Sequence, residues 1–269
     1  MIESFKLAAL EAGQRILGIY EEGFQFETKG DGSPVTIADQ QAEEIILNHL
    51  STLCPDVPVI AEEAMAAGIM PEIGSRFILV DPLDGTREFI SRNGEFTVNI
   101  ALIEDGNPTK GVIYAPVTRE LFWGTVGQGA YRAEANGLEL GEVTQMSCSA
   151  FSEELRVLAS RSHRSERTNA LLEKLDNSSI VAAGSSLKFC RLAEGKADFY
   201  PRMEPTMEWD TAAGQAILCA AGGSVVVEGG GPLEYGKLET PQDKPFANPC
   251  FLAVADEKII SHYGIRSGW

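Results

Sequence analysis

The chain has 269 residues, 44% of them hydrophobic and 23% charged, and a formal net charge of −17. That composition is typical of a globular protein with a substantial core, and the negative charge argues against nucleic acid or anionic lipid as partners. No stretch reaches the roughly 18 apolar residues needed to cross a bilayer, and the first residues lack a signal-peptide pattern. The five cysteines are scattered and contain no CxxC pair, so neither a disulfide framework nor a zinc site is indicated.

Two helices are predicted first. Apolar residues at helical spacing over residues 5–19 predict an amphipathic helix. Glycine and proline then mark a loop over residues 30–34. A second helix is predicted over about residues 37–50, and it opens on Thr36 and Asp39 at the spacing of a capping box.

Strands follow, and two of them end on acidic residues. VPVIAEE at 57–63 predicts a short strand that ends on Glu62 and Glu63. RFILVDPLDGT at 76–86 predicts an apolar strand that runs into Asp-Pro and Asp-Gly turns. Over residues 97–131, the segments TVNIALI, GVIYAP and ELFWGTV predict consecutive strands joined by turns.

The second half of the chain alternates between the two kinds of element. Strands are predicted near residues 156–159, 180–182, 198–200 and 224–227, and helices near residues 166–175, 187–194 and 211–221. Such alternation predicts an α/β half after an α+β half. We therefore expect two domains, 1–145 and 146–269.

The sequence DPLDGT at 81–86 is the strongest chemical signal. Two carboxylates, Asp81 and Asp84, flank a proline at a strand end, and the carbonyl of Leu83 is expected to face the same way. Such an all-oxygen set suits Mg²⁺, and Gly85 allows the backbone to approach a ligand closely. The alternative is a plain strand-ending turn, in which Asp-Pro and Asp-Gly are common. The length of the motif favours the metal site.

Two further acidic positions are candidates for the same site. Glu62 and Glu63 alone would be a solvated pair, but beside a second acidic strand end they offer a third carboxylate. Asp210 in WDTAAG lies where a helix is predicted to begin. The roles of helix cap and metal ligand both remain open for Asp210, and one carboxylate can perform both.

Three segments resemble the signature segments of the inositol monophosphatase superfamily of lithium-sensitive, Mg²⁺-dependent phosphatases. They are AEE at 61–63, DPLDGT at 81–86 and WDTAAG at 209–214, and their order and spacing match over nearly the whole chain. Other segments resemble the CysQ-type branch, whose members are 3′(2′),5′-bisphosphate nucleotidases. These segments are GSPVTIADQQAEEII at 32–46, REFISRNGEFTVNIALIEDG at 87–106, SRSH at 160–163, GSSLKFC at 184–190 and EWDTAAGQAIL at 208–218.

The resemblance implies a layered αβαβα fold with the site between its two halves. It also implies two or three Mg²⁺ ions, whose ligands would be Glu62, Asp81, the Leu83 carbonyl, Asp84 and Asp210. Thr86 would orient the attacking water with Asp39 behind it, and Glu62 would join them as a catalytic residue. Glu62 is preferred to Glu63 because it aligns with the first acid of the family's pair.

Substrate contacts are implied by the same resemblance. They would come from Gly85, Thr86, His163, Ser185, Ser186, Lys188, Arg202 and Asp210. Lys188 is suited to a second phosphate, and Arg202 is a further phosphate candidate. The alternatives are a loop histidine at 163 and a serine pair that only caps a helix.

The expected function is hydrolysis of the 3′-phosphate of 3′-phosphoadenosine 5′-phosphate to AMP by metal-activated water, a step of sulfur assimilation. No phosphoenzyme is expected, because DPLDGT lacks the DxDx[TV] arrangement of aspartyl nucleophiles. Relatives acting on inositol monophosphate or fructose 1,6-bisphosphate are the alternative, and a non-catalytic metabolite-binding protein is a remote one. We expect a cytoplasmic protein with lithium sensitivity. The sequence leaves open peripheral association with the inner membrane and the choice between monomer and homodimer.

Overall fold

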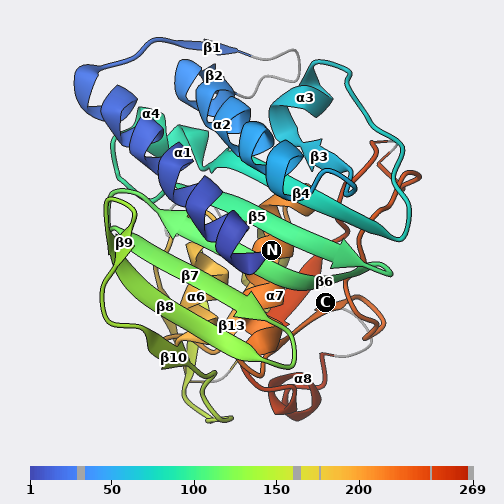
Figure 1. Cartoon of the computed structure of the whole chain (residues 1–269). Coiled ribbons are helices and arrows are strands. Elements are labelled where there is room, and N and C mark those ends of the chain that lie inside the picture. Colours follow the sequence, from blue (N-terminus) through green and yellow to red (C-terminus); the bar gives the residue numbers. More distant parts are fainter. Residues whose placement is uncertain (29–33, 160–164, 176, 243, 266–269) are drawn as a thin grey trace.

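The described part of the chain folds into two large β-sheets with helices on both sides of each (Figure 1), and Phe26–Thr28 pairs with Pro34–Thr36 in a small two-stranded sheet. The computed structural model describes residues 1–28, 34–159, 165–175, 177–242 and 244–265. The helices in these ranges are α1 Ile2–Glu22, α2 Ile37–Leu53, α3 Glu62–Ala66, α4 Thr86–Ile90, α5 Glu166–Leu172, α6 Leu187–Ala193, α7 Glu208–Ala220 and α8 Lys258–His262. The strands are β1 Phe26–Thr28, β2 Pro34–Thr36, β3 Val59–Ala61, β4 Arg76–Asp84, β5 Thr97–Glu104, β6 Asn107–Ala115, β7 Glu120–Thr125, β8 Gly129–Asn136, β9 Glu139–Leu140, β10 Thr144–Met146, β11 Leu155–Leu158, β12 Ser178–Val181, β13 Phe199–Arg202, β14 Ser224–Val227 and β15 Phe251–Val254.

The larger sheet is formed by the first half of the chain. Within the described ranges it has eight strands in the order β10-β8-β7-β6-β5-β4-β3, with β9 beside β8. Its pairings are antiparallel except for that of β3 with β4, which is parallel. The sheet is buried on both faces, which explains the unbroken apolar run of β4. Ile78 and Val80 face α1 and α2, whereas Phe77 and Leu79 face the opposite layer.

The helices α1 and α2 cover one face of this sheet, as Figure 1 shows. The apolar face predicted over residues 5–19 is buried, with Phe5 and Ile16 fully covered. The predicted capping box is confirmed at the start of α2. There the N–H of Thr36 donates to Asp39 Oδ2 at 2.7 Å, and the N–H of Ala38 donates to Thr36 Oγ1 at 3.1 Å.

The helices α6 and α7 form the middle layer, between the larger sheet and a smaller one. The smaller sheet has the order β12-β11-β13-β15-β14 and mixes parallel with antiparallel pairs. Along β15, Phe251 and Ala253 face the middle layer, while Leu252 and Val254 face the outer helices α5 and α8. The layered αβαβα fold is therefore confirmed.

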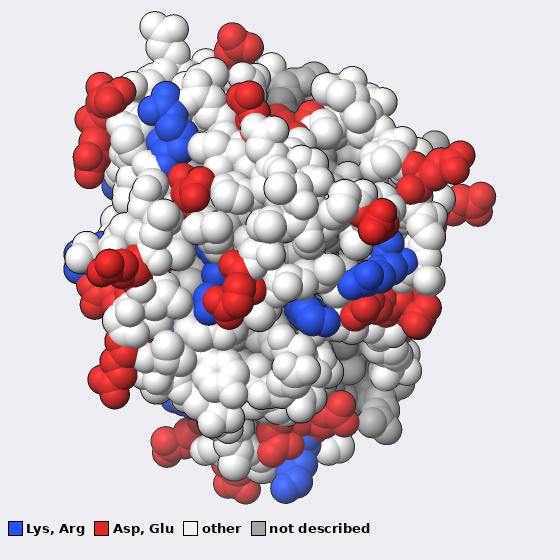
Figure 2. Space-filling model, viewed as in Figure 1, with Lys and Arg blue, Asp and Glu red and all other residues white. Residues whose placement is uncertain are grey.

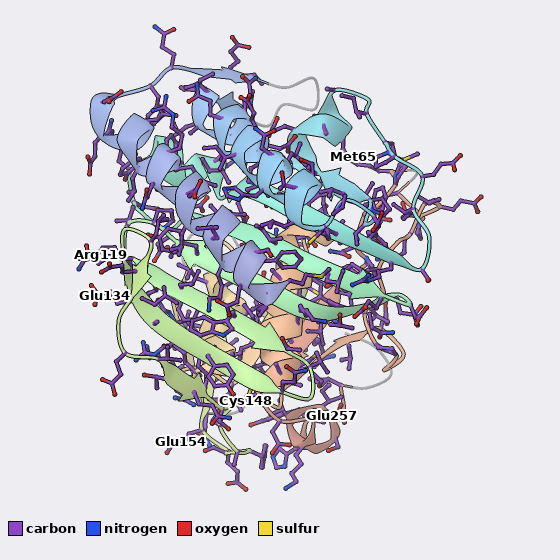
Figure 3. The ribbon with its side chains drawn as sticks, in the orientation of Figure 1. Met65, Arg119, Glu134, Cys148, Glu154 and Glu257 are labelled. Atoms are coloured by element: carbon purple, nitrogen blue, oxygen red, sulfur yellow. The ribbon has the colours of Figure 1, made fainter. Side chains whose placement is uncertain are left out.

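Most of the elements that the sequence analysis did not predict are short, although the eight-residue strand β8 inside the larger sheet was missed as well. Among them are β15, α8 and the five-residue helices α3 and α4. The predicted strand over 57–63 ends at Ala61, and Glu62 already belongs to α3. In Figure 3, Met65 of α3 is labelled, and its side chain packs against the central core. The helix predicted over 211–221 begins earlier, at Glu208.

The division into two domains at residue 145 stays a prediction. The larger sheet ends with β10 at Met146, and the smaller sheet begins with β11 at Leu155. However, α6 and α7 come from the second half and share one hydrophobic cluster with both sheets. The two halves therefore share one hydrophobic cluster, and each half also has a cluster of its own.

Acidic side chains are spread over the face shown in Figure 2, several with a basic side chain beside them. Arg119 and Glu134, which are labelled side by side in Figure 3, form one such exposed ion pair. Pairs of this kind contribute little to stability, since water screens both charges. None of the helices in the described ranges is long and apolar enough to span a bilayer.

Candidate metal and phosphate site

The acidic motif lies where β4 breaks its pairing with β5. The register of the two strands shifts between Asp81 and Asp84, so the chain turns between the two carboxylates. Asp81 is buried, and its Oδ1 accepts the N–H of Leu83 at 3.1 Å. Both carboxylates and the Leu83 carbonyl thus come from one short turn.

Gly85 makes the close turn into α4 possible. Its φ of 95° lies in the left-handed region, and a Cβ at this position would lie 3.2 Å from the carbonyl oxygen of Glu95. Thr86 then begins α4, and its Oγ1 donates to Asp39 Oδ1 at 3.1 Å. Asp39 is 2% exposed, and its other oxygen is held by Thr36. Thr86 and Asp39, which sequence reasoning singled out together, are in direct contact.

Glu62 is positioned by a residue that the sequence analysis missed. Glu43 of α2 accepts the N–H groups of Glu63 and Ala64, both at 2.8 Å. It therefore caps the N-terminus of α3, on which Glu62 is the first residue. Asp39 and Glu43 are four residues apart in a predicted helix, and this spacing on one helix face was the available signal.

Asp210 lies in the first turn of α7, at the far side of the same site. Met207 is the residue that precedes the helix, and its N–H donates to Asp210 Oδ2 at 2.9 Å. Asp210 thus caps the helix from its third position rather than from the position before it. One oxygen performs the capping, and the role of metal ligand for the other oxygen stays a prediction.

Burial and neighbouring carboxylates raise the pKa values of Asp81 and Asp210. Burial raises the pKa of Asp81 well above its usual value, and the charges of Glu62, Asp84, Asp210 and Asp39 raise it further. Burial and the charge of Asp84 also raise the pKa of Asp210 to about 8, although a backbone hydrogen bond opposes this shift. Five carboxylates from four separate elements, α2, α3, β4 and α7, therefore act on one buried region.

This donor set fits Mg²⁺. Buried carboxylates that repel each other are stabilised by a divalent cation, and Mg²⁺ prefers oxygen ligands. As the side chains lie, no group of three acidic, histidine or cysteine residues in the described ranges is gathered as tightly as the ligands of a single ion. Asp84 and Asp210 each have one oxygen turned to a neighbouring N–H group. The fit therefore rests on the oxygen chemistry and on the shared repulsion.

A pocket of about 830 Å³ opens between the two halves of the chain, with Asp84 and Asp210 in its wall. Lys188 and Arg202 line the same pocket. Lys188 Nζ donates to the carbonyl of Ser185 at 3.2 Å, and Arg202 Nη2 donates to the carbonyl of Pro205. Arg202 Nε is buried and has no partner in the described part of the chain. The pocket thus combines acidic and basic groups.

The serine pair before α6 contacts the acidic motif. Ser185 Oγ and the N–H of Ser186 both donate to Asp84 Oδ2, the latter at 2.6 Å. Ser186 is 2% exposed, and its hydroxyl turns inward to Thr97 and Asn99 of β5. The fourth expected contact of this region, His163, lies outside the described residues.

The chain matches a known protein family over nearly its whole length. The profile of the inositol monophosphatase family matches residues 1–261. The chain belongs to the inositol monophosphatase family. It is 44% identical over 253 residues to the 3′(2′),5′-bisphosphate nucleotidase CysQ of Salmonella typhimurium, covering 93% of this chain and 98% of that protein. Its identity to the nucleotidase of the same name from Escherichia coli K12 is 43% over the same shares of the two chains.

Solved structures give the same result. The crystal structure of CysQ from Bacteroides thetaiotaomicron aligns with a TM-score of 0.77 and 40% identity, covering 94% of this chain and 97% of that one. An inositol monophosphatase from Thermotoga maritima aligns with a TM-score of 0.73 at 23% identity, which shows the shared fold. The family, the fold and the class of enzyme, a phosphatase, were predicted from the sequence and are confirmed.

Proposed function

We propose that this phosphatase hydrolyses the 3′-phosphate of 3′-phosphoadenosine 5′-phosphate, giving AMP and phosphate, as a step of sulfur assimilation. The observation that carries the proposal is the pocket that places Lys188 and Arg202 in one wall with Asp84 and Asp210. A site for a substrate with two phosphates needs acidic residues that hold cations for one phosphate and basic side chains for the other. The similarity to the CysQ nucleotidases supports this substrate class.

Mg²⁺ would be held by Glu62, Asp81, the Leu83 carbonyl, Asp84 and Asp210. When bound, Mg²⁺ neutralises the phosphate and lowers the pKa of a coordinated water to give the nucleophile. The chain's own part is to present these oxygens from β4, α3 and α7 in one buried region. This assignment explains why Asp81 and Asp210 are buried beside other carboxylates that raise their pKa values.

Thr86 and Asp39 are proposed to handle the proton of the attacking water. The Thr86 hydroxyl gives its hydrogen to Asp39 Oδ1, so its lone pairs remain to accept a hydrogen bond from the water. Asp39 is fixed by two hydrogen bonds from Thr36 and cannot turn away. A proton leaving the water can therefore be shared along Thr86 towards Asp39.

Arg202 and Lys188 are proposed to bind the phosphate that is not cleaved. Arg202 Nε is a hydrogen-bond donor without a partner in the described residues. A buried donor of this kind destabilises the protein unless an acceptor binds to it. A phosphate oxygen supplies one. Lys188 Nζ lies 5.6 Å from the ring of Tyr200, which also lines the pocket.

The test is phosphate release from 3′-phosphoadenosine 5′-phosphate, inositol 1-phosphate and fructose 1,6-bisphosphate, each with Mg²⁺ and with EDTA. We expect the highest kcat/KM for the nucleotide and no turnover with EDTA. A preference for the inositol or sugar phosphate would keep the metal site and discard the roles of Lys188 and Arg202. Full turnover in EDTA would discard the metal site itself.

A further inference from the structure

A row of buried hydroxyl and amide groups joins β5 to the turn before α6. Thr97 Oγ1 lies 2.7 Å from Ser185 Oγ and 2.7 Å from Ser186 Oγ. Ser186 Oγ donates to Asn99 Oδ1 at 2.8 Å, and Thr97 Oγ1 lies 3.1 Å from the same oxygen. We call Thr97, Asn99, Ser185 and Ser186 the polar seam. It links residues 88 positions apart in the chain.

The polar seam ends on the carboxylate of Asp84. Thr97 is paired with Asp84 across the β4–β5 ladder, and Ser185 Oγ and the N–H of Ser186 both donate to Asp84 Oδ2. An ionised carboxylate can only accept, so Ser185 gives its single proton to Asp84. When Thr97 directs its one hydrogen to Ser185 rather than to Asn99, Thr97 is the donor in that contact. A directed chain of donors therefore runs from β5 to Asp84.

The backbone around the polar seam is closely packed. A Cβ at Gly184 would lie 2.8 Å from Glu95 Cβ and 3.1 Å from the Glu95 carbonyl oxygen, so the turn rests directly on the chain that leads into β5. Ser185 follows with a φ of 51°, in the left-handed region. The metal turn at Gly85 rests on the same Glu95 carbonyl. Both turns therefore pack against the same group, the backbone carbonyl of Glu95.

The seam is retained at a cost in stability. Asn99 is 1% exposed, and its Nδ2 has no hydrogen-bond partner within the described residues. An unsatisfied buried donor is destabilising, and an apolar side chain of similar shape would avoid the cost. Polar groups that break this rule beside a site are expected to serve the site rather than the fold.

We infer that the polar seam orients the carboxylate of Asp84 for the cation, and that Thr97 and Asn99 are positioning residues. Ser185 and Ser186 then act on the metal ligand and not as substrate contacts. The inference rests on the metal role of Asp84 in the proposed function. Since Ser185 and Ser186 belong to the second half of the chain, the ligand geometry forms only when the two halves meet.

Thr97→Val tests the seam, because valine keeps the shape and removes the hydroxyl. Thr109→Val is the matched control, being the same change on the neighbouring strand β6 at the other end of the β5–β6 pair, where Thr109 contacts Glu104. Mg²⁺ binding is measured by calorimetric titration without substrate, and unfolding by urea. Loss of a hydrogen bond behind a metal ligand is expected to weaken Mg²⁺ affinity by about tenfold in Thr97→Val. The control should bind Mg²⁺ as the wild type does.

Asn99→Leu separates positioning from a structural role. It removes the acceptor of Ser186 Oγ, which is destabilising, and also the unsatisfied donor, which is stabilising, so we expect weaker Mg²⁺ binding with the urea midpoint little changed. A purely structural role would lower the urea midpoint and leave Mg²⁺ affinity unchanged, and would overturn the inference. If Thr97→Val does not fold, Ser185→Gly removes the next hydroxyl and tolerates the positive φ.

The remaining outcomes are distinct. Unchanged Mg²⁺ affinity in Thr97→Val and Ser185→Gly overturns the inference and leaves the proposed function intact. A raised KM for the nucleotide with unchanged Mg²⁺ affinity returns Ser185 to the role of substrate contact and also overturns it. A wild-type chain that does not bind Mg²⁺ removes the role of Asp84, and both proposals fail together.

Discussion

Asp84 belongs to the first half of the chain but takes its hydrogen bonds from the second. Its Oδ2 accepts from Ser185 and Ser186, while the residue also lines the pocket with Asp210. An aspartate in this position cannot be exchanged for a neutral residue of the same shape without loss. The amide oxygen of asparagine could still accept from Ser185 and Ser186, but its NH2 group would then replace the oxygen offered to the cation and the negative charge would be lost.

Asp84→Asn is therefore expected to lower kcat by on the order of 10³-fold, since several kcal/mol of charge stabilisation depend on the cation. Phosphate release at saturating Mg²⁺ measures the effect, and circular dichroism checks the fold. Asp105→Asn is the control, because Asp105 lies in a turn with a φ of 50°, which asparagine also adopts. Near-normal turnover in Asp84→Asn would contradict the metal assignment.

Lys188→Ala is expected to raise KM for 3′-phosphoadenosine 5′-phosphate by about tenfold, the value of one hydrogen bond to a charged group. The KM for 3′-AMP, which lacks the 5′-phosphate, should stay within about twofold of the wild type. Lys196→Ala serves as control because Lys196 is exposed and pairs with Glu194. Equal effects on both nucleotides would show that Lys188 does not bind the second phosphate.

At the scale of elements, short helices carry much of the site. The helices α3 and α4 have five residues each, and they place Glu62 and Thr86. Neither helix would be stable in isolation, since helix nucleation is unfavourable and a helix of five residues forms too few hydrogen bonds to offset it. They depend on residues of longer elements, as α3 depends on Glu43 of α2.

Glu43→Gln is expected to lower the free energy of unfolding by about 1–2 kcal/mol, because the charged acceptor of two backbone N–H groups is lost. We also expect a rise in the Mg²⁺ concentration that gives half-maximal activity, since the helix that carries Glu62 loses its cap. Urea unfolding and Mg²⁺ titration measure the two effects. The neighbouring exposed Glu44→Gln should change neither, and an equal loss there would point to net charge as the cause.

The difference between long elements and short ones also explains what could be predicted from the sequence. The apolar face of α1 and the capping box of α2 are local patterns, and both were predicted. The five-residue helices contain too little periodicity to detect, and β15 was missed although its residues are fully buried. The polar seam was not predictable at all, because Thr97 and Ser185 meet only through the fold. The acidic site residues were named because their motifs resemble those of a family.

At the scale of the whole molecule, we expect the buried carboxylates to make stability depend on pH and on Mg²⁺ together. Asp210 has a pKa of about 8 when folded, against its ordinary value of 3.8 when unfolded. Between these values the folded state holds a proton that the unfolded state has lost, so rising pH favours unfolding. Asp81 adds in the same direction, since its pKa is also raised.

In EDTA, the unfolding temperature is therefore expected to fall as the pH rises from about 5 to about 8. Mg²⁺ requires ionised ligands, so its stabilising increment should be larger at the higher pH. Differential scanning calorimetry at both pH values, with EDTA and with Mg²⁺, measures the two increments. An equal increment at both values would show that these carboxylates do not hold the cation.

The middle layer has a consequence for how the protein is made. One face of the larger sheet, including Phe77, Ile103 and Phe122, is covered by helices that belong to residues 187–220. During synthesis the sheet leaves the ribosome well before these helices do. A nascent chain that stops at Met146 would carry an uncovered apolar surface, the kind that recruits chaperones or aggregates.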